Sequence, residues 1–418
     1  MSVNSTPQEI GYVLYAPSNS NDTFLIDKQG NTQQTWYGEY PPGMAVYLLP
    51  DGNVLRAESI EPQYCGYPGG RIAVYGPGVD GASALIWAYT ISSPTLQQTH
   101  DVYPMKNGNV LVCAWELISY ESAIQAGRTP DTIPPDGFWS GKVIELQPDL
   151  QNQTASEVWS WRFWDHVDNT GTSPRTLDVN QLGTPIPGQG NVDWIHMNAV
   201  TYNEELDQVM VSSRNLNEIY IIDHGCSTAE ASGHSGGKRG LGGDFLYRWG
   251  CPQNYGAAGP QQLFGQHSPY WIPRGFPYEG QIMINNDGFE RSRSPSGWET
   301  TADVIDPPIG DGHGGYLLEP GKAFGPAAPM LNRPVPQRLW NTFEGSAQML
   351  PDGNILLCAA QFFGDSSNPA TFYEMGSGSE PIWSYTLPSG TAFRCHQYSR
   401  QYVDGILSPP ITQGATAR

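Results

Sequence analysis

Basic residues are scarce in this sequence. Lys and Arg together number 21, only five of them Lys, against 41 Asp and Glu, and the formal net charge is −20 at pH 7. Proteins that bind nucleic acid use a basic surface to neutralise phosphates, so this composition excludes nucleic acid as a partner. The acidic surface predicts solubility and does not specify a substrate.

Long apolar runs are also absent. No run reaches the roughly 18 residues that a transmembrane helix needs, so no membrane insertion is expected. The first residues, "MSVNSTPQEIGYVLYAP", contain neither a basic region nor a long apolar stretch. No export signal is therefore predicted in this chain, and nothing in its sequence excludes the cytoplasm.

The six Cys are widely spaced and include no CxxC pair, which argues against zinc-ribbon and thioredoxin-like sites. Cys113 and Cys358 lie in apolar, strand-like runs, and we expect them to be buried free thiols. A disulfide between Cys226 and Cys251 would suit an exported protein, because exported proteins meet oxidising conditions.

Gly (48), Pro (36), Tyr (22) and Trp (13) are plentiful, whereas charged residues make up only 15% of the chain. This mixture favours short strands and many turns over long helices. The length of 418 residues suits either two ordinary domains or one large β domain built from repeats.

A repeat favours the second alternative. The segments "AVYLLPDGNVLRA" (45–57), "DVYPMKNGNVLVCAWE" (101–116) and "SAQMLPDGNILLCAA" (346–360) each read as two apolar strands joined by an Asp/Asn-Gly turn. Weaker copies occur at 198–214 and 269–286. A second pair of strands belongs to each copy, and in five copies it ends in Trp, at Trp36, Trp87, Trp159, Trp249 and Trp383. We interpret these Trp residues as core between neighbouring units.

About six four-stranded units predict an all-β fold, a six-bladed β-propeller with four-stranded antiparallel blades. No linker composition divides the chain, so residues 1–418 are expected to form a single domain. The strand "GYVLYAP" near the start is expected to complete a blade with C-terminal strands. Insertions at about 117–141, 165–192, 226–242 and 287–300 are expected to be long loops at the channel mouth.

Three histidines open the inner hairpins of consecutive units, namely His100, His196 and His267. Equivalent positions of innermost strands gather around the channel of a propeller, so these side chains should converge. Counting outward from the turn near Glu205 places Arg214 beside His196. The same counting places Trp115 opposite His100 and residues 285–287 near His267. A cationic, aromatic mouth of this kind suits a planar aromatic molecule with an anionic group.

The chain resembles the bacterial aryl-sulfate sulfotransferase family, six-bladed propellers that move a sulfuryl group from one phenol to another. The similarity is sharpest in "DWIHMNAVTYNEELDQVMVSSRNLNEIYIID", "GDFLYRWGCPQNY", "LFGQHSPYWI", "INNDGFER" and "AQMLPDGNILL". This resemblance implies that His267 is transiently sulfurylated and that His196, Arg214 and His100 complete the catalytic set. It also implies small aromatic sulfate esters and phenols as partners, no metal or other cofactor, and a periplasmic or secreted location.

In the mechanism that the resemblance implies, His196 acts as general acid and then general base, while Arg214 and His100 bind the sulfuryl oxygens. We expect Asn198, Trp115 and Asn286 to contact the substrate. The sequence does not predict the oligomeric state.

Two other functions stay open at this point. Histidines from several blades can also hold iron in a metal-dependent propeller enzyme, although Arg214 would repel a cation. A non-catalytic binding propeller is the other alternative. The sequence has no GxSxG nucleophile motif and no identifiable pair of glycosidase carboxylates.

The remaining candidates are weaker. The segment "GHSGGKRGLGGD" (233–244) lacks the residue order of a phosphate-binding loop and is expected to be a flexible insertion. Asp165, His166 and His313 are expected at the rim or in structural roles, and His396 is expected to be structural near the C-terminal closure.

Overall fold

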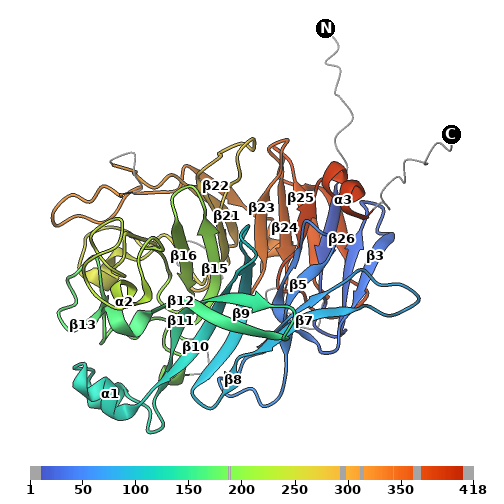
Figure 1. Cartoon of the computed structure of the whole chain (residues 1–418). Coiled ribbons are helices and arrows are strands. Elements are labelled where there is room, and N and C mark those ends of the chain that lie inside the picture. The colour runs from blue at the N-terminus through green and yellow to red at the C-terminus, as the bar shows by residue number, and fades with distance from the viewer. Residues whose placement is uncertain are drawn as a thin grey trace, which may run out of the picture.

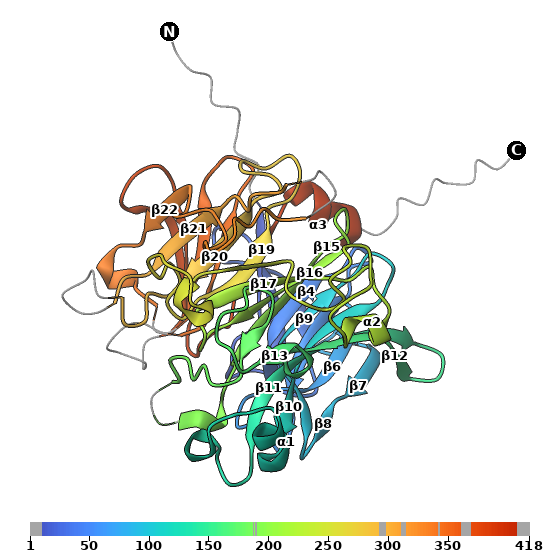
Figure 2. The same ribbon diagram turned by 90° about the vertical axis from the view of Figure 1, so that its left-hand side faces the viewer.

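Six antiparallel four-stranded sheets form the blades of a propeller ring in this computed structural model. The structure describes residues 11–186, 188, 190–291, 298–310, 315–341, 343–360 and 369–407. The predicted six-bladed β-propeller is therefore confirmed. Figure 1 and Figure 2 show the blades following one another in chain order, with the C-terminal strands beside the N-terminal ones.

The strands of each blade are given from the channel outward. The first blade contains β27 (His396–Tyr398), β1 (Tyr12–Tyr15), β2 (Asp22–Ile26) and β3 (Thr32–Tyr37). The second contains β4 (Pro42–Leu48), β5 (Val54–Ser59), β6 (Gly70–Tyr75) and β7 (Leu85–Thr90). The third contains β9 (Leu96–Pro104), β10 (Val110–Ile118), β11 (Phe138–Asp149) and β12 (Thr154–Arg162), with β8 (Ser92–Ser93) added at the β9 edge.

The fourth blade contains β15 (Met197–Asn203), β16 (Gln208–Ser213), β17 (Glu218–Asp223) and β18 (Tyr247–Trp249). The fifth contains β19 (His267–Trp271), β20 (Ile282–Asn286), β21 (Thr301–Ile305) and β22 (Leu331–Pro334). The sixth contains β23 (Ser346–Met349), β24 (Ile355–Ala359), β25 (Thr371–Met375) and β26 (Pro381–Thr386).

The other elements are short. They are the helices α1 (Tyr120–Gln125), α2 (Thr228–Ala231) and α3 (Arg400–Leu407), the parallel pair β13 (Val167–Asp168) and β14 (Leu177–Asp178), and the 3-10 turns η1 (Pro130–Thr132), η2 (Phe163–His166), η3 (Gly190–Val192), η4 (Pro252–Tyr255) and η5 (Gln337–Leu339). No helix among the described residues is both long and apolar enough to cross a bilayer.

The insertion predicted at about 117–141 is present, but both of its ends differ from the prediction. β10 continues to Ile118 and β11 begins at Phe138, so only residues 119–137 form a loop, which contains α1 and η1. The two strands lengthen because residues 110–118 and 138–146 pair without a break. Residues 165–192 and 226–242 form loops with short elements, as expected, and residues 292–297 of the fourth insertion lie outside the described part of the chain.

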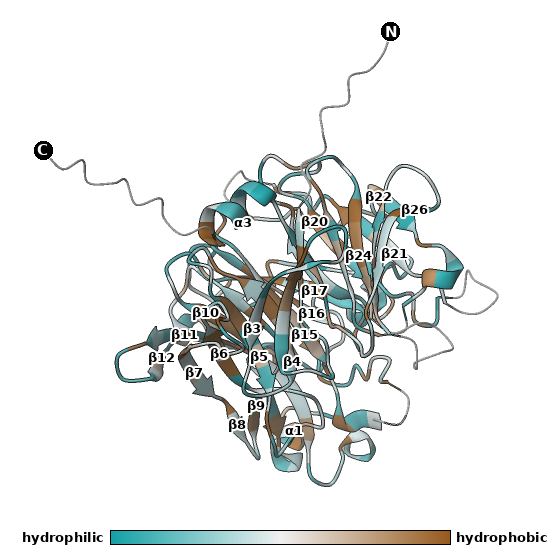
Figure 3. Ribbon diagram, turned by 90° about the vertical axis from the view of Figure 1, so that its right-hand side faces the viewer, coloured by the Kyte–Doolittle hydropathy of each residue, from teal (hydrophilic) through white to brown (hydrophobic). Residues whose placement is uncertain are grey.

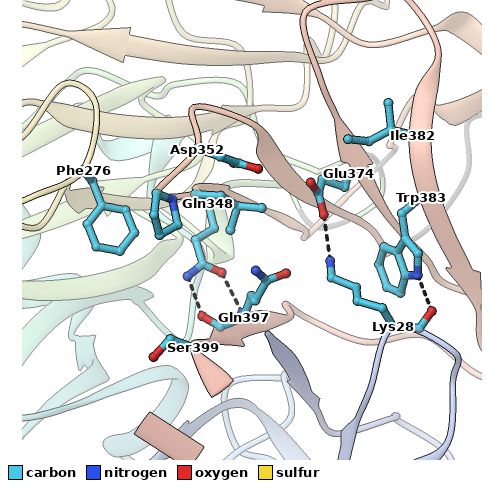
Figure 4. A pocket seen from close by; sticks show the side chains of 11 residues that line it. Lys28, Phe276, Gln348, Asp352, Glu374, Ile382, Trp383, Gln397 and Ser399 are labelled. Atoms are coloured by element: carbon cyan, nitrogen blue, oxygen red, sulfur yellow. Dashed lines mark hydrogen bonds and ion pairs between the residues drawn. The ribbon is translucent and has the colours of Figure 1, made fainter. Parts of the chain in front are cut away.

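The ring closes through strands from both ends of the chain, as expected. β27 pairs antiparallel with β1, with Leu14 opposite His396. Figure 4 shows the junction between the sixth and first blades, where Gln348 and Gln397 exchange hydrogen bonds and Lys28 pairs with Glu374 at 2.8 Å.

The apolar core lies between neighbouring blades. One cluster joins Ile72 of β6 to Val112 of β10, and another joins Val304 of β21 to Leu357 of β24. Figure 3 shows hydrophobic residues on strands such as β24, in contrast to the hydrophilic loops. Fully burying each such side chain stabilises the fold by about 1.5–3 kcal/mol.

Tryptophans at the outer strands also connect successive blades. The side chains of Trp36, Trp87, Trp159 and Trp249 are buried, which confirms their interpretation as core, whereas Trp383 is only half-buried. An indole N–H donates to the backbone of the next blade in five cases, from Trp36 to Gly52, Trp87 to Thr154, Trp161 to Gly243, Trp249 to Pro326 and Trp383 to Lys28. In the third blade Trp161 makes this bond rather than Trp159.

All six cysteines are free and buried. The expectation for Cys113 and Cys358 is confirmed, and the disulfide between Cys226 and Cys251 that the sequence left open is not formed. Each of these two thiols has a local partner instead, because Cys226 Sγ donates to Asp223 O at 3.0 Å and Cys251 Sγ donates to Gln253 Oε1 at 3.3 Å.

Candidate active site

The pairing of each inner hairpin is irregular near its candidate histidine. The ladders between β9 and β10, β15 and β16, and β19 and β20 all shift register near the histidine. His100 (φ 57°), His196 (φ 48°) and Ser268 (φ 52°) adopt left-handed backbone conformations there. Bulges commonly re-aim side chains beside active sites, and a left-handed non-Gly residue costs about 1 kcal/mol or more. The repeated bulge turns equivalent side chains of three blades toward the channel.

His267 is held by a buried carboxylate. Its Nδ1 lies 2.8 Å from Asp287 Oδ2, and Asn285 donates to Asp287 Oδ1 at 2.6 Å. The ladder pairs His267 with Asn285, so the expected proximity of residues 285–287 is confirmed. Burial and the Arg214 guanidinium lower the pKa of His267 to about 3, which keeps the imidazole neutral near pH 7.

Burial raises the pKa of Asp287 well above its usual value, although Arg214 and the amide of Asn285 oppose this shift. When Asp287 is ionised its oxygens only accept, and Nδ1 of His267 then carries the hydrogen. The lone pair of Nε2 is then available as a nucleophile.

His196 has a similar partner. Its Nδ1 lies 2.6 Å from Asp193 Oδ2, which also accepts the Tyr67 hydroxyl at 3.1 Å. Burial lowers the pKa of His196, whereas Asp193 opposes this shift. The ring packs edge-on against Tyr67, with centroids 4.9 Å apart. This environment allows His196 to exist as imidazole or as an imidazolium stabilised by Asp193.

His100 lies beside His196, with ring centroids 4.9 Å apart. Its Nδ1 is 2.8 Å from Thr99 Oγ1, which also lies 3.3 Å from Pro68 O. Because a carbonyl oxygen only accepts, the Thr99 hydroxyl donates to Pro68 O and accepts from Nδ1–H of His100, which leaves a lone pair on Nε2 of the neutral ring. Burial lowers the pKa of His100 well below its usual range.

The predicted cross-strand position of Trp115 is wrong. The ladder pairs Trp115 with Gln97, because the bulge between Val112 and Ala114 shifts the register. The indole nevertheless stacks on His100, with centroids 5.5 Å apart, and its Nε1 donates to Met197 O at 2.8 Å.

Arg214 is the buried cation of the site, with only 1% of its surface exposed. Its Nη1 donates to Thr184 O at 3.0 Å and to Asn215 Oδ1 at 2.9 Å. Its Nε and Nη2 are buried without a partner, and no carboxylate in the described part of the chain forms an ion pair with it. Because buried donors are normally satisfied, this guanidinium is arranged for an anion.

Phenyl rings surround that guanidinium. Arg214 lies over Phe289 at 4.7 Å and over Phe343 at 5.5 Å. Gly265 is close to the two unpartnered nitrogens, since a Cβ there would lie 3.8 Å from Nε. The guanidinium is therefore shielded from bulk water, and its hydrogen bonds to an anion would be strong.

Asn198 and Asn286 differ in what they leave free. Asn198 Nδ2 donates to Gln266 O at 2.8 Å, while its buried Oδ1 has no partner. Both groups of the Asn286 amide are occupied, because Nδ2 donates to Gln262 O and Asp303 Oδ2, and Oδ1 accepts from Phe264 N. Asn286 therefore fixes the segment that leads to His267.

Sequence reasoning missed several residues that support the histidines. Among them, Arg394 donates to Asp101 Oδ2 at 2.8 Å and to the Tyr47 hydroxyl at 2.7 Å, and its charge helps to lower the pKa of His100 and His267. Glu344 begins the equivalent inner segment of the sixth blade, and burial together with Asp287 raises its pKa to about 7. Asp101 and Asp193 were visible as acids near His100 and His196, but nothing in the sequence pointed to Arg394.

The other candidates lie outside this cluster. His396 begins the closing strand β27, as expected, where burial and Arg394 lower its pKa to about 3. Asp165 pairs with Arg162 at 3.1 Å, and His313 lies outside the described residues. His166 is buried at the end of η2, and residues 233–244 make internal hydrogen bonds, such as that from Gly242 N to Gly236 O.

Comparisons with known proteins give the family. No curated protein matches the sequence. Solved structures similar to this chain include a putative 6-phosphogluconolactonase from Bacteroides fragilis (10% identity, 95% of this chain and 100% of that chain, TM-score 0.44). Another is a putative 6-phosphogluconolactonase from Bacteroides uniformis (8% identity, 91% of this chain and 84% of that chain, TM-score 0.47). A third is the periplasmic gluconolactonase PpgL of Pseudomonas aeruginosa (9% identity, 91% of this chain and 84% of that chain, TM-score 0.42). At these identities and TM-scores they carry no functional argument.

The sequence model of one family, described as arylsulfotransferase (ASST), matches residues 19–304, which is more than half of the chain. The match includes His100, His196, Arg214 and His267. The chain belongs to the arylsulfotransferase family.

Proposed function

We propose that this protein transfers a sulfuryl group from an aryl sulfate to a phenolic acceptor through a sulfohistidine at His267. The observation that carries the proposal is the pair of unpartnered, buried donors on Arg214 beside two histidines whose pKa values are depressed. A sulfate ester supplies the missing negative charge and acceptor oxygens.

In the first half-reaction, Nε2 of His267 attacks sulfur. The N–S bond forms as the S–O bond to the aryl group breaks, and the electron pair leaves with the phenol oxygen. His196, as the imidazolium paired with Asp193 Oδ2 at 2.6 Å, gives its proton to that oxygen. The anionic ester favours the imidazolium before the step, because opposite charges lie close together.

In the second half-reaction, neutral His196 takes the proton of the acceptor phenol. The phenol oxygen then attacks sulfur, the N–S bond breaks, and its electron pair returns to Nε2 of His267. Arg214 would donate to the sulfuryl oxygens in both transition states, in which charge is spread over these oxygens, and His100 would do so in the form that carries a hydrogen on Nε2.

The residues expected to contact the substrate take different roles in this proposal. The unpartnered Oδ1 of Asn198 is suited to accept a hydrogen bond from a phenolic hydroxyl. Trp115 and Asn286 act by positioning, because their polar groups are bonded to the protein. We also propose, from the family resemblance, a periplasmic or secreted location.

The geometry does not favour an iron site in the channel. Among the described residues, the three channel histidines are not a set whose ligand atoms lie within 4.8 Å of one another. Arg214 lowers the pKa of both His196 and His267, and it would equally oppose a cation between them.

The test is the intact mass of the protein after mixing with a chromogenic aryl sulfate and no acceptor. We expect one sulfuryl group to be added and one equivalent of phenol to be released. His267→Ala should abolish both, whereas His224→Gln, which replaces a histidine of the fourth blade outside the channel, should leave both unchanged. If His267→Ala released phenol at the wild-type rate, a sulfohistidine at this position would be refuted.

A further inference from the structure

We propose that His166, His234 and Asp244 form a binding site for one divalent metal ion of the zinc type, outside the channel. One ligand atom from each residue lies within 4.8 Å of the other two. His166 ends η2, and His234 and Asp244 lie in the segment between α2 and β18. Two imidazoles and one carboxylate are a common donor set for zinc.

His166 is oriented as metal-binding histidines usually are. Its side chain is fully buried, and it stacks on Trp161 with centroids 5.5 Å apart and planes 5° from parallel. Nε2 lies 2.8 Å from Ala231 O. A carbonyl oxygen only accepts, so Nε2 carries the hydrogen, and in the neutral ring Nδ1 presents a lone pair.

That lone pair faces another acceptor. Nδ1 of His166 lies 2.8 Å from Asp244 Oδ1, and Nδ1 of His234 lies 2.8 Å from the same oxygen. In the neutral ring of His166, this lone pair and the carboxylate oxygen repel each other, and either a proton on Nδ1 or a metal ion between the two atoms removes the repulsion. A metal ion would satisfy all three atoms together.

The dimensions suit zinc after a small movement. Zinc binds imidazole nitrogen and carboxylate oxygen at about 2.0–2.2 Å, so tetrahedral ligands lie about 3.3–3.5 Å apart, and the carboxylate would move by about 0.5 Å. The His234 side chain is 61% exposed, so a water molecule can reach the fourth position. The Asp244 side chain is 11% exposed and His166 is buried, so the surrounding protein holds these two ligands in place.

His224 shows how the same residue types look when only a proton is held. Its Nδ1 faces Asp207 at 2.7 Å and its Nε2 faces Glu145 at 2.9 Å, so each nitrogen has its own carboxylate. Burial lowers its pKa, but the two hydrogen bonds outweigh burial and raise it to about 9. At Asp244, by contrast, two histidines share one carboxylate oxygen.

The site would connect two loops that border the catalytic cluster. α2 packs beside β12, as Figure 2 shows, and His166 stands where the chain leaves β12 for the loop at 167–192. That loop carries Thr184, whose carbonyl accepts from Arg214 Nη1 at 3.0 Å. We therefore assign the ion a structural role, in which it fastens the loop after α2 to the base of the loop that orients Arg214.

The experiment uses the full chain after chelation and dialysis. Calorimetric titration with Zn²⁺ should show one equivalent bound. Thermal unfolding should give a higher Tm with Zn²⁺ than without it. With Co²⁺ in place of Zn²⁺, the absorption spectrum should show a visible band typical of tetrahedral nitrogen and oxygen ligands. His234→Ala should weaken binding at least about tenfold, because it removes one of three protein ligands. His234 is exposed, so this variant should fold.

Two further variants separate this site from other histidines. His267→Ala and His224→Gln should both bind Zn²⁺ as the wild type does. Failure of the wild-type protein to bind Zn²⁺, or equal affinity in His234→Ala, would overturn the proposal. Loss of binding in His267→Ala alone would place the ion in the channel and would also overturn it.

Discussion

The backbone N–H of Arg214 donates to the carbonyl oxygen of His196 at 3.1 Å, at the open end of the β15–β16 hairpin. This bond fixes the cation and the proposed acid–base residue in one rigid hairpin, so that neither has to move during transfer. Preorganised donors of this kind act on the charge that develops in the transition state.

Arg214→Lys tests that arrangement. The substitution keeps the charge but loses the two nitrogens that have no protein partner, Nε and Nη2. We expect the rate of phenol release in the first turnover to fall about 100- to 1,000-fold, with little change in Tm. The measurement is stopped-flow absorbance with a chromogenic aryl sulfate. A change of less than about threefold would show that the guanidinium does not bind the transferred group.

Asp287→Asn tests how His267 is activated. The amide can donate to Nδ1 and so favour the tautomer whose Nε2 carries a hydrogen, which is not a nucleophile. By analogy with other carboxylate–histidine pairs, we expect the rate of adduct formation to fall about 1,000- to 10,000-fold. Intact mass should still reach one sulfuryl group after long incubation, because the nucleophile is present. A variant that never forms the adduct, yet folds normally, would assign Asp287 a larger role than orientation.

The rates of the two half-reactions should depend on pH in opposite ways. The pKa of His267 is lowered to about 3, so acidification to pH 5 leaves the nucleophile neutral, whereas an unperturbed imidazole would lose about 30-fold. His196 must be protonated for phenol release and neutral for transfer to the acceptor. Phenol release should therefore hold or rise from pH 8 to pH 5, while acceptor transfer falls. Single-turnover rates for each half-reaction measure this, and parallel slopes would contradict a role for one residue in both.

The blades were predictable from the sequence because each repeat carries its own strand, turn and Trp signals. Trp36, for example, ends an outer strand and is fully buried against the second blade. The convergence of His100, His196 and His267 followed from the same repeat, since equivalent positions of a propeller face one axis. The position of Arg214 beside His196 could be predicted by counting outward from the turn of the hairpin that carries both residues.

What the sequence concealed depends on bulges, loops and closure. A bulge pairs Trp115 with Gln97, and such a shift of register has no clear sequence signal. Thr184 reaches Arg214 from a loop, and Arg394 comes from the segment that enters β27 only when the ring closes. The sequence left a Cys226–Cys251 disulfide open, because spacing alone does not show whether two thiols meet, and both thiols are free.

The last prediction concerns stability at the interface of the third and fourth blades. His224 joins Asp207 and Glu145, and its pKa is raised to about 9 in the folded state, against about 6.5 when unfolded. A raised pKa stabilises the fold fully below pH 6.5, and the contribution is lost as pH rises through 9. We expect His224→Gln to lower the free energy of unfolding at pH 6 by about 2–3 kcal/mol, and by much less at pH 10.

Urea unfolding of wild type and His224→Gln at several pH values would measure this difference. The difference between the two proteins should shrink steadily between pH 7 and pH 10, since the folded wild type then loses the proton that the two carboxylates hold. A pH-independent loss in His224→Gln would mean that His224 contributes through packing against Trp159, whose ring centroid lies 4.8 Å away, rather than through its charge.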